Sequence, residues 1–393
     1  MMKDRIWTKN FIVISLINFL SILMFYLLIV TIASYAIETY QVSTSIAGLV
    51  SSIYVIGALI GRLLTGRIIG KVGPSKILRY GVVLFFVSAC LYFIEIHIAF
   101  LLFNRFIQGI FVGVIGTAAG TIIAHILPAS RKGEGIGYYS LSVILASAIG
   151  PFIGIFLMKF DNGNFYIFGL NVLLSLIMII VLAFIRLDKQ MFSSSHEEVK
   201  EESFISKFME PKSIPISFVA LLMGFVYSGV MSFLSFYAEE INLVDAASVF
   251  FIVYALATIF TRPYCGKLMD KKGPNLIVYP CLVLFALGMF LFGNASSSWI
   301  LLVSAALIGL GFGNFNSIAQ TIAVKVTEPH RFGLATSTYY IFYDMGLGFG
   351  PYLLGLIVPL IGYRSIFLWM VPIIIISIPL YFVLHGRKAK LYV

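Results

Sequence analysis

Two stretches of this 393-residue sequence share one pattern: Arg62-Leu-Leu-Thr-Gly66-Arg-Ile-Ile-Gly70-Lys71-Val-Gly73-Pro74 and Arg262-Pro-Tyr-Cys-Gly266-Lys-Leu-Met-Asp270-Lys271-Lys-Gly273-Pro274. The arginine, the two framing glycines, the lysine and the proline recur at a constant offset of 200 residues. The same offset relates further positions, namely Gly109 and Gly309, Gly113 and Gly313, Thr121 and Thr321, Arg131 and Arg331, Gly133 and Gly333, Gly150 and Gly350, and Pro151 and Pro351. The chain is therefore predicted to be a duplicated unit.

The composition indicates what kind of unit was duplicated. Hydrophobic residues make up 60% of the chain and charged residues only 11%, whereas a soluble domain is about 25% charged. A helix needs about 20 apolar residues to cross a bilayer, and twelve such stretches are expected at 11–36, 44–64, 77–95, 99–124, 137–158, 165–185, 214–237, 246–264, 276–294, 299–324, 334–358 and 363–384. The predicted fold is an all-α polytopic membrane protein with 12 transmembrane helices in two pseudo-symmetric six-helix bundles.

The net charge of +10 is explained by topology rather than by a nucleic-acid partner. If the N-terminus is cytoplasmic, 24 of the 27 Lys and Arg residues fall on the inner side of this arrangement. Such asymmetry follows the positive-inside rule. An even number of spans then places both termini in the cytoplasm.

The duplication also predicts the domain organisation. We expect an N-terminal six-helix bundle at 1–185, a cytoplasmic central loop at 186–213 with mixed charge, and a C-terminal six-helix bundle at 214–393. Parallel repeats of this kind place a substrate site between the halves at mid-depth, and rocking of one half against the other exposes it alternately to each side.

Four motifs resemble those of one family. The first resembles a loop signature and consists of Gly66-x-x-x-Gly70-Lys71-x-Gly73, with an echo around Asp270. Two resemble motifs of the fourth and fifth helices, namely Asn104-Arg105-x-x-Gln108-Gly109 and Ala146-x-x-x-Gly150-Pro151-x-x-Gly154. The last resembles a motif of the eleventh helix, namely Asp344-x-Gly346-x-x-x-Gly350-Pro351. Together they resemble the major facilitator superfamily, and the helix 5 and 11 motifs resemble its 12-helix drug:proton antiporters.

The resemblance implies a secondary transporter of the bacterial cytoplasmic (inner) membrane. It implies proton-coupled export of small amphipathic organic compounds by a monomer, with the proton gradient as energy source and no cofactor. An exporter or importer of one metabolite, such as a sugar or a siderophore-like compound, and a lipid flippase remain open on the same fold. A receptor that binds without transport is a further alternative.

The resemblance also assigns residues to gating and conformational change. They are Arg62, Gly66, Gly73, Gly150, Pro151, Arg262, Gly266, Asp270, Gly273, Arg331, Gly350 and Pro351. The acidic residue of the loop signature, which in the family latches the halves, is Gly70 in the first half and Asp270 in the second. We therefore expect the latch around Asp270, with Arg262 or Arg331 as its partner; the alternative is that these residues only set the topology. The Gly-Pro pairs are expected to kink their helices, for a mechanical or a purely structural reason.

Arg105 and Asp344 are the candidates for proton coupling. Arg105 lies a few residues into the helix at 99–124, where a cation is costly unless it faces water or a partner. It either faces the cavity or extends to the outer interface. Asp344 lies about 16 Å along the helix at 334–358, near the middle of the bilayer. A carboxyl at that depth needs a bound proton or a cationic partner, or is held by neighbours such as Tyr340. Its repeat counterpart is Ile144, so the acid belongs to one half only.

Polar residues inside the apolar helices are candidates for substrate contacts, with helix packing as the alternative. They are Asn18, Gln108, Tyr227, Asn314, Asn316, Gln320 and Tyr340. Since these are aromatic and amide side chains, an amphipathic or aromatic substrate is favoured. A strongly anionic substrate would call for a second buried cation, which the sequence does not reveal.

The chemistry of an enzyme or a metal site is not predicted. The cysteines Cys90, Cys265 and Cys281 lie within apolar runs, and neither His97 nor His125 has metal-ligand partners at usable spacing. No P-loop pattern is present, so an ion gradient rather than ATP is expected to drive transport.

Overall fold

The computed structural model describes residues 5–185 and 205–388 of the chain, and in these two ranges it contains helices and no strand. The longer helices are α1 (Lys9–Ile29), α2 (Ile32–Tyr40), α3 (Thr44–Val72), α4 (Pro74–Cys90), α5 (Ile98–Ile126), α6 (Lys132–Leu157), α7 (Gly163–Leu182), α8 (Ile214–Glu240), α9 (Val244–Lys272), α10 (Asn275–Gly293), α11 (Ser298–Ile308), α12 (Asn314–Lys325) and α13 (Phe332–Leu384). Short 3-10 helices are η1 (Leu91–Phe93), η2 (Ala129–Arg131), η4 (Ile205–Lys207) and η6 (Pro329–Arg331), and η5 (Gly309–Gly313) is a π-helical turn.

Eleven helical segments of the described residues are long and apolar enough to cross a membrane. The last of them, Pro329–Lys388, is 60 residues long, about three times the length that one crossing needs. Gly362 breaks it, with φ of 79° and ψ of 164°, a conformation that glycine adopts without the steric cost of a side chain. The two parts of α13 make twelve spans, so the predicted fold is confirmed.

One predicted span differs from the structure. The stretch at 11–36 was expected to be one helix, but it divides into α1 and α2 at Val30 and Thr31. The Thr31 hydroxyl donates to the carbonyl oxygens of Leu27 and Leu28, at 3.1 and 3.4 Å. Such back-bonding from a threonine competes with the backbone ladder and bends a helix.

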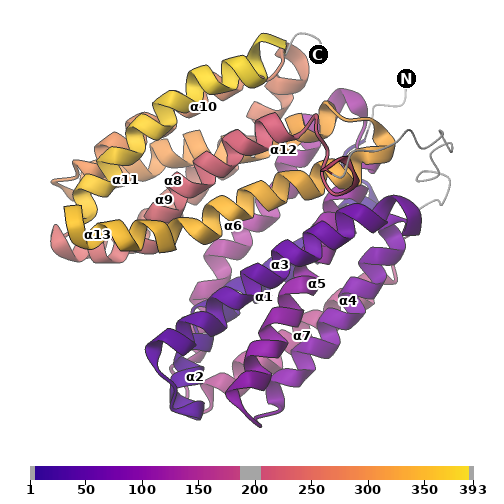
Figure 1. Ribbon diagram of the computed structural model, residues 1–393, viewed down its shortest axis with the longest axis vertical. Coiled ribbons are helices and arrows are strands. Elements are labelled where there is room, and N and C mark those ends of the chain that lie inside the picture. The colour runs from indigo at the N-terminus through magenta and orange to yellow at the C-terminus, as the bar shows by residue number, and fades with distance from the viewer. Residues whose placement is uncertain (1–4, 186–204, 389–393) are drawn as a thin grey trace. The chain divides into compact units, whose positions relative to one another are not determined.

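The chain forms two compact units, and Figure 1 shows that neighbouring helices within each unit run roughly side by side. Unit 1 contains Met1–Ile126, Leu141–Met209 and Pro329–Ser337; unit 2 contains Leu127–Ser140, Glu210–Glu328 and Thr338–Val393. The first turns of α6 therefore belong to unit 2, and the first turns of α13 belong to unit 1.

The 200-residue sequence repeat corresponds to equivalent helix contacts in the two units. In unit 1, α3 lies along α5 so closely that a Cβ on Gly109 would collide with the carbonyl of Tyr54. In unit 2, a Cβ on Gly309 would meet the carbonyl of Tyr254 in the same way. The two contacts are 200 residues apart at both partners. The glycines recur because each helix pair needs close backbone approach at the same point.

Apolar side chains also cover the outside of the helices. Leu360 is 80% exposed, and Trp299 and Tyr264 are each 75% exposed. In water such a surface would be an aggregation hazard, but in a bilayer it faces lipid. The polar side chains are turned inward, where they form the clusters described next.

Candidate functional site

A column of aromatic rings crosses unit 2 at mid-depth. The ring of Tyr227 on α8 stacks on Tyr254 of α9 and on Phe312 of η5, with centroid distances of 5.4 and 4.2 Å. Phe312 stacks on Tyr343 of α13 at 6.4 Å. Since η5 lies at the middle of the span Ser298–Lys325, these rings lie about halfway across the bilayer. Tyr227, expected to contact substrate, is part of this column.

Polar contacts between α12 and α13 extend the aromatic column. The Gln320 amide donates to the Tyr340 hydroxyl at 3.0 Å. The Tyr339 hydroxyl donates to the Asn316 backbone carbonyl at 2.8 Å, and it also contacts the Asn316 side-chain oxygen. The structure thus brings together three of the predicted cavity residues, Asn316, Gln320 and Tyr340. Their contacts in this structure connect α12 to α13.

Asn314, another predicted cavity residue, serves the local helix geometry. Its amide donates to the Thr261 hydroxyl at 2.9 Å and to the Leu310 carbonyl at 2.8 Å. Leu310 lies in η5, where bonds of i→i+5 type replace the regular ladder. The Thr258 hydroxyl donates to the carbonyl of Gly309 in the same turn, at 3.0 Å. Side chains therefore donate to two carbonyl groups of the π-turn, those of Gly309 and Leu310.

Arg262 lies behind the aromatic column and is 2% exposed. Its guanidinium donates to the carbonyl of Gly313, at the end of η5. The phenols of Tyr254, Tyr339 and Tyr343 are its electrostatic neighbours. The expectation that Arg262 is the partner of Asp270 is wrong. Arg262 lies about two turns before Asp270 on α9 and bonds Gly313 instead.

Asp344 is half-buried on α13, next to Tyr343 in the chain and one turn from Tyr340. It is the twelfth residue after the helix start at Phe332, which puts it about 18 Å along the helix. This depth agrees with the depth expected from the sequence. Its hydroxyl neighbour Tyr340 is engaged by Gln320.

Unit 1 buries its own arginine. Arg105 of α5 is 0% exposed, and its guanidinium lies 4.4 Å from the ring centroid of Tyr54. It donates to the Val50 carbonyl at 3.2 Å, to the Tyr92 hydroxyl at 3.3 Å and to the Gln108 side-chain oxygen at 3.4 Å. The guanidinium therefore stays inside the bundle and does not extend to the outer interface.

The Arg105 cluster leaves several polar atoms buried without a hydrogen-bond partner. They are Arg105 Nη2, Gln108 Nε2, Asn104 Oδ1 and the Tyr54 hydroxyl. Buried polar atoms of this kind usually bind ordered water or a ligand. The remaining predicted cavity residue of unit 1, Asn18, is separate from this cluster in its contacts, since its amide donates to the Ser142 hydroxyl at 2.8 Å.

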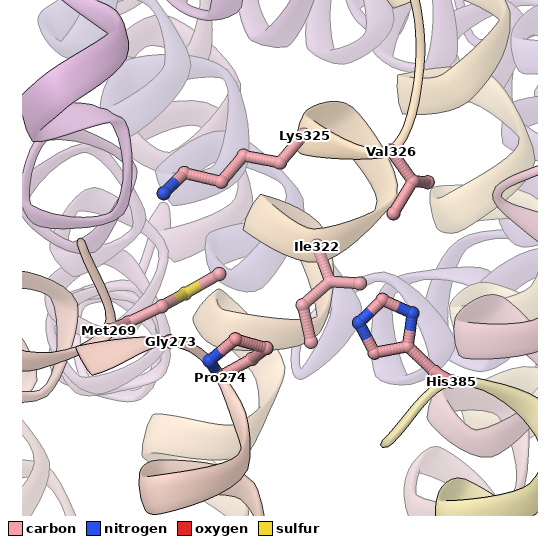
Figure 2. A pocket seen from close by; sticks show the side chains of 7 residues that line it. All are labelled: Met269, Gly273, Pro274, Ile322, Lys325, Val326 and His385. Atoms are coloured by element: carbon pink, nitrogen blue, oxygen red, sulfur yellow. The ribbon is translucent and has the colours of Figure 1, made fainter. Parts of the chain in front are cut away.

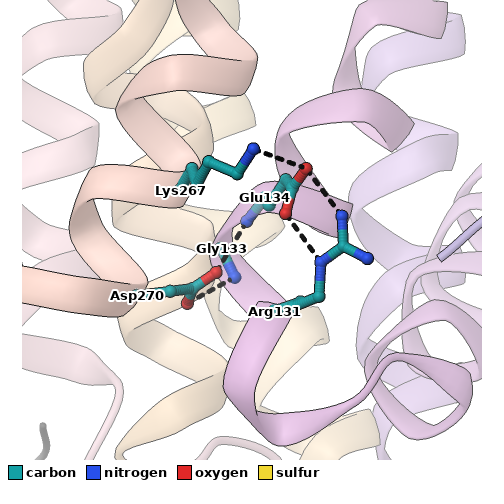
Figure 3. A network of polar contacts seen from close by, with 5 residues as sticks. All are labelled: Arg131, Gly133, Glu134, Lys267 and Asp270. Atoms are coloured by element: carbon teal, nitrogen blue, oxygen red, sulfur yellow. Dashed lines mark hydrogen bonds and ion pairs between the residues drawn. The ribbon is translucent and has the colours of Figure 1, made fainter. Parts of the chain in front are cut away.

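A second type of site lies in unit 2 where α9 ends and α6 begins (Figure 3). The carboxylate of Asp270 on α9 accepts from the backbone N–H groups of Gly133 and Glu134, both at 2.9 Å. Its Oδ1 also lies 2.9 Å from the Lys325 ammonium, and the side chain is 4% exposed. Asp270 therefore binds the positive end of the α6 dipole together with a lysine, in place of the expected arginine.

The first turn of α6 is held by further ion pairs on its other side. The Glu134 carboxylate bonds Arg131 at 2.8 Å and lies 3.9 Å from the Lys267 ammonium, as Figure 3 shows. Beneath them, Gly266 and Gly133 lie so close that a Cβ on Gly266 would collide with the Gly133 backbone. Gly266 is thus required for α6 to contact α9 here.

The repeat-related contact in unit 1 lacks the acid. A Cβ on Gly66 of α3 would lie 2.6 Å from the Ser337 hydroxyl oxygen, and that hydroxyl donates to the Arg62 carbonyl at 2.7 Å. A Cβ on Gly70 would meet nothing within 4 Å. Arg331 donates to the Ser206 carbonyl at 2.8 Å.

The remaining gating residues lie in turns or close helix contacts. Gly73 and Gly273 end α3 and α9 with φ of 87° and 85°, which explains why glycine occupies both positions. Gly150 and Gly350 precede Pro151 and Pro351 inside α6 and α13. A Cβ on Gly150 would clash with Tyr26 of α1, and one on Gly350 with Ser228 of α8.

A small depression lies beside the Asp270 contact, between the ends of α9, α12 and α13 (Figure 2). It is lined by Met269, Gly273, Pro274, Ile322, Lys325, Val326 and His385. Its lining is mostly apolar, with Lys325 and His385 as its ionisable groups. Among the described residues, no group of three or more His, Cys, Asp and Glu side chains could hold a metal ion.

Sequence reasoning missed several members of these sites. Tyr54, Tyr92, Tyr254 and Tyr339 were not singled out, because a tyrosine in an apolar helix has no motif of its own. One signal was available: Tyr54 and Tyr254 are separated by the repeat offset of 200. Lys325 gave no such signal, since its repeat counterpart is His125.

Comparisons with known proteins cover nearly the whole chain. The family model described as Major Facilitator Superfamily matches residues 14–295 and 242–391. The chain is 25% identical to the "Uncharacterized MFS-type transporter MJ1560" of Methanocaldococcus jannaschii, over 91% of this chain and 94% of that protein. It is 24% identical to "Multidrug resistance protein 2" of Bacillus subtilis, over 88% of each chain.

A solved structure shows the same fold. The proton:xylose symporter XylE superposes with a TM-score of 0.74 over 95% of each chain, at 16% sequence identity. At that identity the likeness concerns the arrangement of helices alone.

Proposed function

Because the chain belongs to the Major Facilitator Superfamily, it is a multi-pass membrane transporter and not an enzyme, and we propose that it exports small amphipathic organic compounds in exchange for protons. Transporters of this family use an ion gradient and need no cofactor. The multidrug resistance name of the Bacillus subtilis relative supports export of varied organic compounds.

The observation that carries the proposal is the aromatic column of unit 2. Tyr227, Tyr254 and Phe312 form a stack of aromatic rings at mid-depth, and the neighbouring Asn316 and Gln320 carry amides. Ring faces and a few polar groups suit amphipathic compounds. A sugar site would need more hydrogen-bonding groups, so the column favours an apolar or aromatic substrate.

Asp344 is the proposed proton carrier, and Arg105 is its proposed counterpart in unit 1. Asp344 is half-buried at mid-depth beside the column, so a proton and a substrate can compete for the same region. The unpaired polar atoms around Arg105 suit water or a translocated proton. A carboxyl within a span is costly and usually functional.

We propose the N-terminal half, 1–185, and the C-terminal half, 214–393, as the bodies that move in a monomer. The contact of Asp270 with the start of α6 and the close approach of Gly66 to Ser337 are the proposed gating contacts. The charge asymmetry of the sequence supports a bacterial inner-membrane location with both termini in the cytoplasm.

The test is proton movement in proteoliposomes with an imposed pH gradient. Candidate hydrophobic cations are added to vesicles containing the wild-type protein or Asp344→Asn, and the gradient is followed with a pH-sensitive dye. We expect the wild type, but not the variant, to dissipate the gradient when a substrate is added. The matched control is Asp245→Asn, because Asp245 is an exposed carboxylate at the start of α9.

Equal gradient loss with wild type and Asp344→Asn would exclude coupling through Asp344. Substrate uptake without any change in the gradient would exclude proton antiport altogether. Loss of activity in Asp245→Asn as well would show that the assay responds to any lost carboxylate.

A further inference from the structure

Arg262 is a buried charge without a counter-charge. No carboxylate lies within ion-pair distance of its guanidinium in the part of the chain that the structure describes. One N–H group donates to the Gly313 carbonyl, and the buried Nε has no hydrogen-bond partner. A cation at this depth costs several kcal/mol unless an anion or strong acceptors stabilise it.

A structural role does not explain this arrangement. The Gly313 carbonyl needs one hydrogen-bond donor, which a neutral side chain can supply, as Thr258 does for Gly309 at 3.0 Å. An arginine brings a positive charge and five N–H donors. One of these donors serves Gly313, the Nε–H is buried without a partner, and Tyr254 of the aromatic column is an electrostatic neighbour of the guanidinium.

The surroundings of Arg262 are those of an anion site. Tyr254, Tyr339 and Tyr343 are its electrostatic neighbours. The Tyr339 hydroxyl already donates to Asn316, so Tyr254 and Tyr343 are the phenols proposed to donate to an anion beside the guanidinium. Tyr343 is half-buried, whereas Tyr339 is 1% exposed. Tyr343 is therefore the more accessible of these two phenols.

We propose that Arg262 binds an anionic group, above all a carboxylate, of the transported compound. The guanidinium fork matches a carboxylate in two parallel hydrogen bonds. The aromatic column from Tyr254 to Phe312 then holds the apolar part of the same molecule. This inference rests on the proposed export function and specifies its substrate class as amphipathic carboxylates, including zwitterions.

The surroundings of Arg262 differ from those of its repeat counterpart in the first half. Arg62 is the repeat counterpart of Arg262, but a Cβ on Gly116 would lie 3.5 Å from its Nη1, so that guanidinium lies against the regular helix α5. In unit 2 the corresponding position is Asn316, and η5 replaces the regular turn.

The test is ligand-dependent thermal stability of the purified full-length protein in detergent. Three matched pairs serve as probes: benzoate and benzamide, 1-naphthylacetate and 1-naphthylacetamide, and indole-3-acetate and indole-3-acetamide. Within a pair the ring is the same and only the charge differs. We expect at least one carboxylate to bind the wild type about tenfold to a hundredfold more tightly than its amide, the range expected for hydrogen bonds to a charged group.

Arg262→Gln is expected to abolish this preference, because glutamine can still donate to Gly313 but carries no charge. The matched control is Arg364→Gln, since Arg364 also donates to a glycine carbonyl, that of Gly293 at 3.1 Å, but is exposed. The control should keep the preference. If Arg262→Gln does not fold, Arg262→Lys is measured instead and should reduce the preference without removing it.

The proposal is overturned if no pair shows a preference for the carboxylate, or if Arg262→Gln keeps the preference of the wild type. These outcomes are separable from failure of the export function. If hydrophobic cations dissipate the pH gradient but no probe pair shows a preference for the carboxylate, proton-coupled export is supported and the anion site is refuted. If the preference for the carboxylate depends on Arg262 but no proton movement is detected, the anion site is supported and proton antiport is refuted.

Discussion

Removal of the Asp270 charge should free the first turn of α6 from α9. In the structure the carboxylate accepts from two backbone N–H groups at 2.9 Å and pairs with Lys325 at the same distance. Asp270→Asn keeps the shape of the side chain, but its amide can accept only one of the two N–H groups and repels the other. It also leaves Lys325, which is 19% exposed, without its partner.

The magnitude follows from these contacts. Each hydrogen bond to a charged group contributes about 1.5–3 kcal/mol, and breaking a largely buried ion pair costs about 3–5 kcal/mol. Because the asparagine retains one bond and Lys325 can turn toward water, we take about 3 kcal/mol as the net loss. This corresponds to about a hundredfold change in the equilibrium between the state in which the first turn of α6 contacts α9 and the state in which it does not.

The assay is amide hydrogen exchange measured by mass spectrometry on the peptide that contains Gly133 and Glu134. In the wild type these amides are bonded to Asp270 and should exchange slowly. In Asp270→Asn they should exchange up to about a hundredfold faster, while peptides from the middle of α5 remain unchanged. Substrate transport should fall at the same time.

The matched control is Lys267→Gln. The Lys267 ammonium lies 3.9 Å from Glu134 in the same contact, but its side chain is 56% exposed, so its loss should cost less than about 1 kcal/mol. Unchanged exchange of the α6 peptide in a folded Asp270→Asn protein would refute the assignment of Asp270 as the residue that holds this turn.

Three further predictions follow from the described contacts. Arg105→Gln should leave a folded protein, checked by size-exclusion chromatography, but should reduce transport at least tenfold, since the cation over Tyr54 is lost. Transport at the wild-type level would contradict the proposed role of Arg105. Gly66→Ala should lower the melting temperature, because the new methyl meets Ser337, whereas Gly70→Ala should not, because it meets open space; equal effects would show that the helix contact is not tight. Thr258→Val leaves the Gly309 carbonyl without its side-chain donor and should cost about 1–3 kcal/mol in denaturant unfolding, and a smaller loss would show that the π-turn does not need it.

Much of the architecture could be predicted from the sequence because its causes are local or periodic. Apolar runs of membrane-spanning length predicted the helices, and the 200-residue offset predicted equivalent packing, which the Gly109–Tyr54 and Gly309–Tyr254 contacts confirm. The break at Thr31 was missed because one hydroxyl decides it, and a threonine within an apolar run rarely ends a helix.

The site was harder to predict because its partners are far apart in the chain. The depth of Asp344 follows from its position along one helix, but the partner of Asp270 does not. That partner is Lys325 together with two backbone amides 136–137 residues away, and backbone donors carry no sequence signature. Arg262 was assigned to the latch by motif alone, since burial in the middle of unit 2 cannot be inferred from a charged residue near a repeated loop pattern.

The π-turn η5, between α11 and α12, bears on how the two halves diverged. The offset is 200 at Gly309, where the π-turn begins and whose counterpart is Gly109. It is still 200 at Thr321, which lies after the turn and whose counterpart is Thr121. No residue was therefore inserted into the second copy, although α5 is a regular helix and its counterpart contains η5. A turn with i→i+5 bonds winds the chain less per residue than an α-turn, so every side chain beyond it is rotated relative to its twin. Asn316 and Gln320 therefore face α13 because the π-turn changes the helical winding before them. The second copy thus gained a different inner surface while its length stayed the same.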